Sequence, residues 1–250
     1  MKTRNAFLAA AVCGLFTLTA CNPEEFIKEV IDENDGEMTL NASLASDGEQ
    51  YFATGDTVKF EAILCDIDST NSTSRFVGMA NKLTESVEGN TYPIVGMNLM
   101  GGSEGTYRID FPINDADFLL NLEWNRLLTG DNDVNVMVVA VNSDAYYIAT
   151  TGEVEITSFG GMASQVTGMV NNAVCKYITD AKIDYIRELK ERIARGVANP
   201  TEYGTDGAAA AQELAAIDWT TYFPTIVFNG TFSCLRTNMA RYLNALNEVE

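Results

Sequence analysis

The architecture of this chain is inferred from one segment, Val134-Asn135-Val136-Met137-Val138-Val139-Ala140-Val141. Every residue in it except Asn135 is apolar, so a strand built from it would present apolar side chains on both of its faces. Such a strand needs cover on both sides, which places it near the centre of a sheet. The segment therefore predicts a core built on β-structure.

Period-two alternation of apolar and polar residues extends this prediction to both sides of that segment. Turn signals such as Asp47-Gly48, Glu88-Gly89-Asn90 and Thr151-Gly152 separate the alternating runs. About eight short antiparallel strands divided by turns predict a β-sandwich over residues 38–158. The apolar positions of these runs are Met38, Leu40, Ala42, Leu44, Val58, Phe60, Ala62, Leu64, Tyr107, Ile109, Phe111, Val154 and Ile156.

The predicted sandwich resembles immunoglobulin-like and fibronectin-like domains in architecture only. The cysteine, tryptophan and cysteine arrangement of antibody domains is missing, because Cys65 has no partner cysteine in the later strands. One segment, 115–128, fits both a strand and a helix. We favour a helix there, since Asn114 and Asp115 offer N-cap chemistry and Thr129-Gly130 offers a stop signal.

After Gly160-Gly161 the apolar period changes to steps of three and four, which is typical of helices. We expect an α+β protein in which a helical region, residues 159–250, follows the N-terminal antiparallel sandwich. Asn199-Pro200 would end the first helix of this region. About three helices are predicted, over 166–193, 208–217 and 232–249.

The first twenty residues have the three parts of a secretory signal. A basic start with Lys2 and Arg4 precedes an apolar stretch over 6–18, and small residues follow it. The apolar stretch is shorter than the roughly 18 to 20 residues that a bilayer-spanning helix requires. We therefore predict a signal peptide over 1–20 that is removed, and no permanent transmembrane anchor.

The residues Leu18-Thr19-Ala20-Cys21 resemble the lipobox of bacterial lipoproteins. The resemblance implies that Cys21 is lipidated and begins the mature chain, with several acyl chains, palmitate among them, for stable anchoring. An acidic tether is expected over 21–37, and its Glu24-Glu25 pair is similar to a tract that sends some Gram-negative lipoproteins outward. The resemblance thus implies an exported chain, lipid-anchored to the outer membrane and facing the cell exterior.

Charge and residue usage exclude several classes of function. The formal net charge of the 250-residue chain is −19, and it becomes −21 when residues 1–20, with Lys2 and Arg4, are removed. Nucleic acids are bound through Lys and Arg, so a nucleic-acid partner is excluded. The chain has no histidine, which removes serine and cysteine triads, the usual zinc sites and histidine-ligated haem. We assign no catalytic, cofactor-binding or metal-binding residues.

Apart from Cys13 and Cys21, three cysteines remain: Cys65, Cys175 and Cys234. An exported protein can form disulfides, and Cys175 with Cys234 is the best pair, because both fall in predicted helices of the same half of the chain. Closing that loop would contribute about 4 kcal/mol in the loop-entropy picture. Two separate buried thiols are the alternative, and both interpretations stay open.

Several groups of residues suggest sites, although each also has a plain structural interpretation. Aspartate pairs at 66 and 68, 115 and 117, and 131 and 133 suggest calcium loops, but they lack the EF-hand pattern. Glu153 and Glu155 suggest a glycosidase acid pair on a face that we expect to be solvated. Either a sugar-binding platform or core packing would explain the aromatic residues Trp124, Tyr146, Tyr147, Trp219, Tyr222 and Phe223.

Two short motifs are similar to bacterial O-glycosylation sites. They are Asp68-Ser69-Thr70 and Asp56-Thr57-Val58. The resemblance implies that Ser69 is an exposed loop residue carrying a glycan. Thr57 fits less well, because it begins a predicted strand.

Anchor, sandwich pattern and missing catalytic groups together predict a non-catalytic cell-envelope lipoprotein that binds a protein or glycan ligand at the cell surface. Two alternatives stay open. One is a carboxylate-based hydrolase of surface polysaccharide, which needs two buried acids in one groove. The other is a structural or assembly partner, whose helices dock on another envelope protein instead of being fully buried in the monomer.

Overall fold

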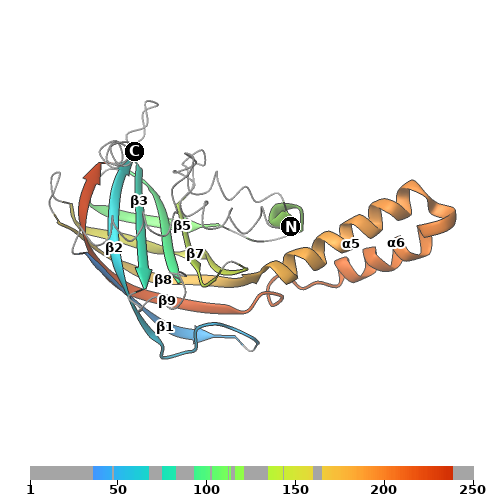
Figure 1. The fold of residues 1–250 in the computed structure, drawn as a ribbon, viewed down its shortest axis with the longest axis horizontal. Coiled ribbons are helices and arrows are strands. Elements are labelled where there is room, and N and C mark those ends of the chain that lie inside the picture. The colour runs from blue at the N-terminus through green and yellow to red at the C-terminus, as the bar shows by residue number, and fades with distance from the viewer. Residues whose placement is uncertain are drawn as a thin grey trace, which may run out of the picture.

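A computed structural model of the chain is shown in Figure 1. The structure describes residues 36–46, 48–67, 75–82, 93–101, 103–111, 113, 116–120, 135–142, 144–159 and 165–238.

Nine strands form a single, mainly antiparallel sheet in the order β5-β7-β6-β4-β3-β2-β1-β9-β8, and β7 also pairs with β8. Because β8 occupies one edge of β7, β5 and β6 share the other edge, beside residues 151–156 and 146–148 respectively. The pairings therefore close into a circuit that leads from β7 through β6, β4, β3, β2, β1, β9 and β8 back to β7, and among the described strands β5 pairs with β7 alone. The strands are β1 (Glu37–Ala45), β2 (Thr57–Ile67), β3 (Arg75–Lys82), β4 (Ile94–Met100), β5 (Gly105–Asp110), β6 (Val136–Ala140), β7 (Ala145–Phe159), β8 (Gln165–Thr179) and β9 (Thr225–Asn238).

This closed sheet corrects the predicted fold class. The prediction of an immunoglobulin-like or fibronectin-like sandwich followed by about three helices is wrong. One sheet contains strands from both sides of residue 158, and the described residues form no second sheet. Beyond residue 160 the described residues contain two helices, α5 (Asp180–Ala198) and α6 (Pro200–Ala215), which lie between β8 and β9 in the chain.

The first part of the helix predicted over 166–193 is strand β8, which contains a bulge. Buried and more exposed residues alternate up to Val170, and the register with β9 shifts before Ala173. Within the bulge Asn172 has a φ of 49°, and its N–H donates to Asn229 Oδ1 at 2.9 Å. Because of the inserted residue, the buried positions Val170 and Ala173 are three residues apart. In a sequence pattern this spacing looks the same as the spacing of buried residues in a helix.

The helix predicted over 232–249 is wrong in its described part. Strand β9 alternates up to Cys234, where its side chains are described, with Ile226, Phe228, Phe232 and Cys234 buried and Gly230 half-buried. Phe232 pairs with strands on both sides, β1 and β8. The alternation starts at Ile226, ahead of the segment from which the helix was predicted, and residues 239–249 lie outside the described residues.

Local sequence sets the ends of the two long helices. The Thr179 side chain caps α5 by accepting a hydrogen bond from the Lys182 N–H at 3.4 Å. Asn199 has φ −135° and ψ 73°, which ends α5, and Pro200 opens α6 with its ring already at a helical φ. The predicted stop at Asn199-Pro200 is confirmed, and the alanine-rich helix is confirmed with an earlier start.

The predictions made for the buried strands are confirmed, except at Leu44. All five residues of β6 are buried, as expected for the apolar segment 134–141. The alternation predicted for the half-buried strands is found in β1, β2, β5 and β7, where Met38, Phe60, Ile109 and Val154 are buried. Leu44 is the exception: it follows a register shift of β1 after Ala42 and is 61% exposed. A helix, α3 (Ala116–Leu120), is present where segment 115–128 was ambiguous, although residues 121–128 lie outside the described residues.

None of the helices that the structure describes has the length and apolar character needed to cross a bilayer.

Candidate functional site

The most distinctive feature of the molecule is the pair of helices inserted between two adjacent strands. We call α5 and α6, residues 180–215, the arm. Since β8 pairs directly with β9, a short turn would suffice to join these strands, yet the chain makes a helical hairpin there. Figure 1 shows the arm extending away from the sheet, with its far end remote from every strand. Such a placement presents surface to the surroundings instead of completing the core.

The two helices of the arm approach each other closely where two glycines face. A Cβ added to Gly196 would lie 2.8 Å from the Cα of Gly207, and a Cβ on Gly207 would meet Gly196 at the same distance. Leu189 and Ala210 are fully buried in the arm. Missing side chains at the glycines thus let the backbones touch, so that the arm packs with little apolar volume.

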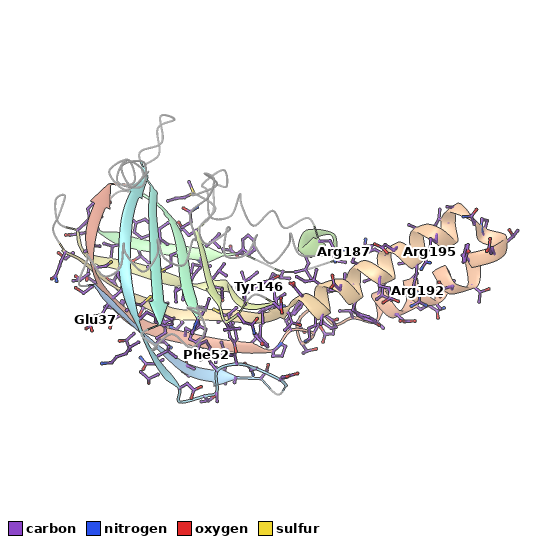
Figure 2. The ribbon with its side chains drawn as sticks, viewed as in Figure 1. Glu37, Phe52, Tyr146, Arg187, Arg192 and Arg195 are labelled. Atoms are coloured by element: carbon purple, nitrogen blue, oxygen red, sulfur yellow. The ribbon has the colours of Figure 1, made fainter. Side chains whose placement is uncertain are left out.

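Charged side chains also join the helices of the arm. The arginines labelled in Figure 2 show where in the arm these side chains lie. The Arg192 guanidinium donates twice to Asp206 Oδ1, at 2.7 and 3.0 Å, and lies 3.7 Å from Glu213 Oε2. Tyr185 donates to Glu213 at 3.2 Å. Hydrogen bonding from Arg192 lowers the pKa of Asp206 below its ordinary value.

The base of the arm is held by two lysines that bind the returning chain. Lys176 donates to the carbonyl of Trp219, and Lys182 donates to the carbonyl of Tyr222 at 2.5 Å. The Lys182 ammonium also lies 4.9 Å from the Tyr222 ring centroid and 5.4 Å from that of Phe223. Partial burial lowers the pKa of both lysines. These contacts fix the arm to the sheet at its base.

Further contacts make the base of the arm part of the core. Ile186 of α5 is fully buried in the main apolar cluster, and α3 packs against α5. The Asp180 N–H donates to the Asp144 carbonyl at 2.8 Å. In the returning segment, the Asp218 side chain accepts hydrogen bonds from Thr220 and Thr221. The first turns of the arm are therefore rigidly connected, whereas its far end is surrounded by solvent.

The far end of the arm carries an exposed apolar residue. Val197, in the last turn of α5, is 79% exposed. Its neighbours Arg195, Ala198 and Asn199 are exposed as well. An exposed branched side chain at the far end of a projecting hairpin is well placed for contact with another molecule.

Apart from the arm, a cluster of aromatic residues lies beside the loop between β1 and β2. Tyr147 stacks against Tyr177, with ring centroids 4.8 Å apart, and contacts Phe52 and Phe228 at 5.7 and 5.5 Å. Its hydroxyl accepts hydrogen bonds from the N–H groups of Tyr51 and Phe52. Burial raises the pKa of Tyr147 to about 12, so the phenol is neutral at ordinary pH.

The two cysteines proposed as a disulfide are free thiols in the structure. Cys234 lies opposite Val166 on β8, nine positions from Cys175, which corresponds to roughly 30 Å along a strand. A disulfide needs Cα atoms within about 7 Å, so this pair cannot form one. Burial raises the pKa of both thiols, that of Cys234 to about 12, and neither is a thiolate at neutral pH.

The remaining residues singled out in the sequence are not brought together into one site. Cys21, Ser69, Trp124 and the aspartates at 68, 115, 117, 131 and 133 lie outside the described residues, and the structure describes no side chain for Asp66. Glu153 is exposed and Glu155 half-buried on β7. Tyr146, Tyr147 and Phe223 are buried and therefore form no open platform, while Trp219 and Tyr222 pack partly against the core at the base of the arm.

The sequence predicted part of both helices of the arm, but not the hairpin that they form between two paired strands. Asn199-Pro200 marks a break between two helical segments, and glycines occur on both sides of it, at 196 and at 204 and 207. What the sequence did not indicate is that the strands on either side of these helices pair with each other.

No protein-family model, curated protein or solved structure matches the chain.

Proposed function

We propose that this chain is a non-catalytic lipoprotein of the cell envelope, anchored to the outer membrane through lipid on Cys21, which binds another envelope protein through its arm. The observation that carries the proposal is the projection of a helical hairpin from a sheet that closes without it. A protein partner is favoured over a glycan, because the exposed side chains of the arm are mainly small or charged and Tyr185 is its most exposed aromatic residue.

The tethering supports this proposal physically. A chain anchored at Cys21 would have residues 22–36 as a spacer, which spans up to about 50 Å when extended. An arm held rigidly at its base could then reach a neighbour in the same envelope. Anchoring raises the local concentration of arm and partner, so that a modest contact area would suffice for association.

Binding through the arm is tested by site-specific photo-crosslinking in intact cells of the source. A photoreactive amino acid replaces Val197 at the far end of the arm, and in a matched control it replaces Thr231, an exposed residue of β9. We expect one defined envelope protein to be crosslinked from position 197 and not from position 231. Equal adducts from both positions, or none from position 197, would contradict binding through the arm.

The anchor is tested separately with Cys21→Ala. We expect the wild-type chain to fractionate with membranes and the variant to be released, with altered gel mobility. A variant that still pellets with membranes and migrates as the wild type would refute the lipid attachment, whatever the crosslinking shows.

A further inference from the structure

The loop between β1 and β2 contains a segment, residues 48–55, that touches the core through one side chain. We call this segment the strap. Phe52 is 4% exposed, whereas Tyr51 is 47% exposed. Among the other strap residues, Gln50 is half-buried and the rest are exposed. The attachment of the strap to the protein interior therefore depends largely on the Phe52 ring.

The Phe52 ring occupies a socket lined by aromatic rings. It lies 5.6 Å from Phe228, edge to face, and 5.7 Å from Tyr147, which is itself stacked on Tyr177. The Tyr147 hydroxyl accepts the N–H groups of Tyr51 at 3.1 Å and Phe52 at 3.2 Å. One phenol thus satisfies two consecutive amides of the strap, in place of a backbone partner.

Both ends of the strap are fixed and carry glycines in a conformation that other residues rarely adopt. Gly48 has φ +133° and Gly55 has φ +96°. Just before the strap, the Ser46 N–H donates to the Thr225 carbonyl at 2.8 Å, and at its end the Gly55 N–H donates to the Ala42 carbonyl at 2.8 Å. Between these points the described residues show no backbone–backbone hydrogen bond from the strap to the sheet. The glycines therefore stand where a hinge is needed.

One group in the strap favours its release. The side-chain Oε1 of Gln50 is buried without a hydrogen-bond partner among the described residues, while the Nε2 of the same amide donates to the Ser46 carbonyl at 2.5 Å. A buried acceptor left unsatisfied costs free energy that solvation would recover on opening. We propose that the strap is a hinged cover that opens while the sheet stays folded, uncovering the aromatic socket, and that the Tyr147 hydroxyl is its latch.

The strap also lies against the segment that returns from the arm. A Cβ placed on Gly48 would be 3.1 Å from Cγ of Pro224, and the Tyr177 N–H donates to the Pro224 carbonyl at 2.7 Å. Pro224 therefore contacts both the strap and a strand that carries a ring of the socket. Opening of the strap would therefore change the contacts of Pro224, which belongs to the segment that returns from the base of the arm.

The test is site-resolved amide hydrogen exchange on the full mature chain at increasing, sub-denaturing concentrations of urea. Exchange through a local opening exposes little surface and depends little on denaturant, whereas exchange through global unfolding depends on it strongly. We expect the Tyr51 and Phe52 amides to exchange together, faster than the Ala42 and Tyr177 amides and with a much weaker dependence on urea.

Two tyrosine variants distinguish a latch from general packing. Tyr147→Phe keeps the ring and removes the hydroxyl, so the Tyr51 and Phe52 amides should exchange about three- to tenfold faster, while the Ala42 amide is unchanged. Tyr177→Phe removes the hydroxyl of the stacked ring, which makes no hydrogen bond to the strap in the described part of the chain, and should leave both strap amides at the wild-type rate. Strap amides that exchange only with global unfolding in the wild type, or that respond equally to both variants, would overturn the proposal.

Discussion

At the scale of single residues, the glycines of α6 show how the same amino acid can have opposite roles three positions apart. Gly207 lies in the contact with Gly196, where an added Cβ would be 2.8 Å from a backbone atom. Gly204 is in the same helix, and an added Cβ there would meet only Pro200 Cβ, at an ordinary 3.8 Å. Gly207 is therefore required by packing, whereas Gly204 is merely unfavourable for a helix.

Replacing each of these glycines by alanine should shift the stability of the arm in opposite directions. Gly207→Ala should destabilise the arm by about 1–3 kcal/mol, because the helices must move apart. Gly204→Ala should stabilise it by about 0.5–1 kcal/mol, because alanine has less backbone freedom to lose. Thermal unfolding followed by circular dichroism at 222 nm measures both variants. A destabilising Gly204→Ala or a neutral Gly207→Ala would show that the helices do not pack as described.

Single residues also explain where prediction from the sequence stops. The burial of Met38, Phe60 and Val154 follows from alternation alone, since a strand has a fixed period. Asn172 departs from that period. Asparagine adopts a positive φ more readily than most residues, but it does so in many turns as well and does not by itself mark a bulge. One bulge was enough to turn the alternation of β8 into an apparent helical pattern.

At the scale of elements, the two helices of the arm are joined by the pairing of Arg192 with Asp206. The folded pKa of Asp206 is lower than its unfolded value, near 3.8. The carboxylate therefore contributes stability that is present above about pH 3.8 and is lost as the pH falls through the folded pKa. Because the Asp206 side chain is exposed and that of Arg192 is only partly covered, salt should weaken this contribution.

We expect the helical content to depend less on pH in the acid range when the titrating carboxylate of Asp206 is removed. In Asp206→Asn the loss of signal at 222 nm below pH 4 should be shallower than in the wild type, with the arm less stable at pH 7. Glu191→Gln, which removes one exposed carboxylate of α5 outside this pair, is the matched control and should follow the wild-type curve. If the acid titrations of all three proteins coincide, the interaction of Arg192 with Asp206 contributes nothing.

The helices of the arm could be predicted from the sequence better than the strand pairing around them, for a physical reason. The arm helices have local determinants, Thr179 at one start and Asn199-Pro200 between them, so that part of their extent was visible in the sequence. The pairing of β8 with β9 depends on residues about sixty positions apart. No local pattern specifies such a pairing. The aromatic socket, in which Tyr147 and Phe228 surround Phe52, was hidden for the same reason.

At the scale of the whole molecule, a closed circuit of strands forms a scaffold to which the arm is added. Ile186 and the two lysine contacts tie the base of the arm to this scaffold. The rest of the arm is held by contacts within the hairpin. The sheet should therefore fold without the far part of the arm, and loss of that part should remove binding without removing the fold.

The most direct measurement uses a chain whose arm has been shortened. It asks whether this chain still co-purifies with the partner protein that was identified by crosslinking from position 197 of the full-length chain. In that variant residues 190–209 are replaced by a short glycine-containing turn, which keeps Ile186, Leu189 and Leu214 in place. We predict that the variant keeps the β-sheet circular dichroism and thermal midpoint of the wild type and no longer retains the partner. A folded variant that retains the partner as well as the wild type does would contradict the account.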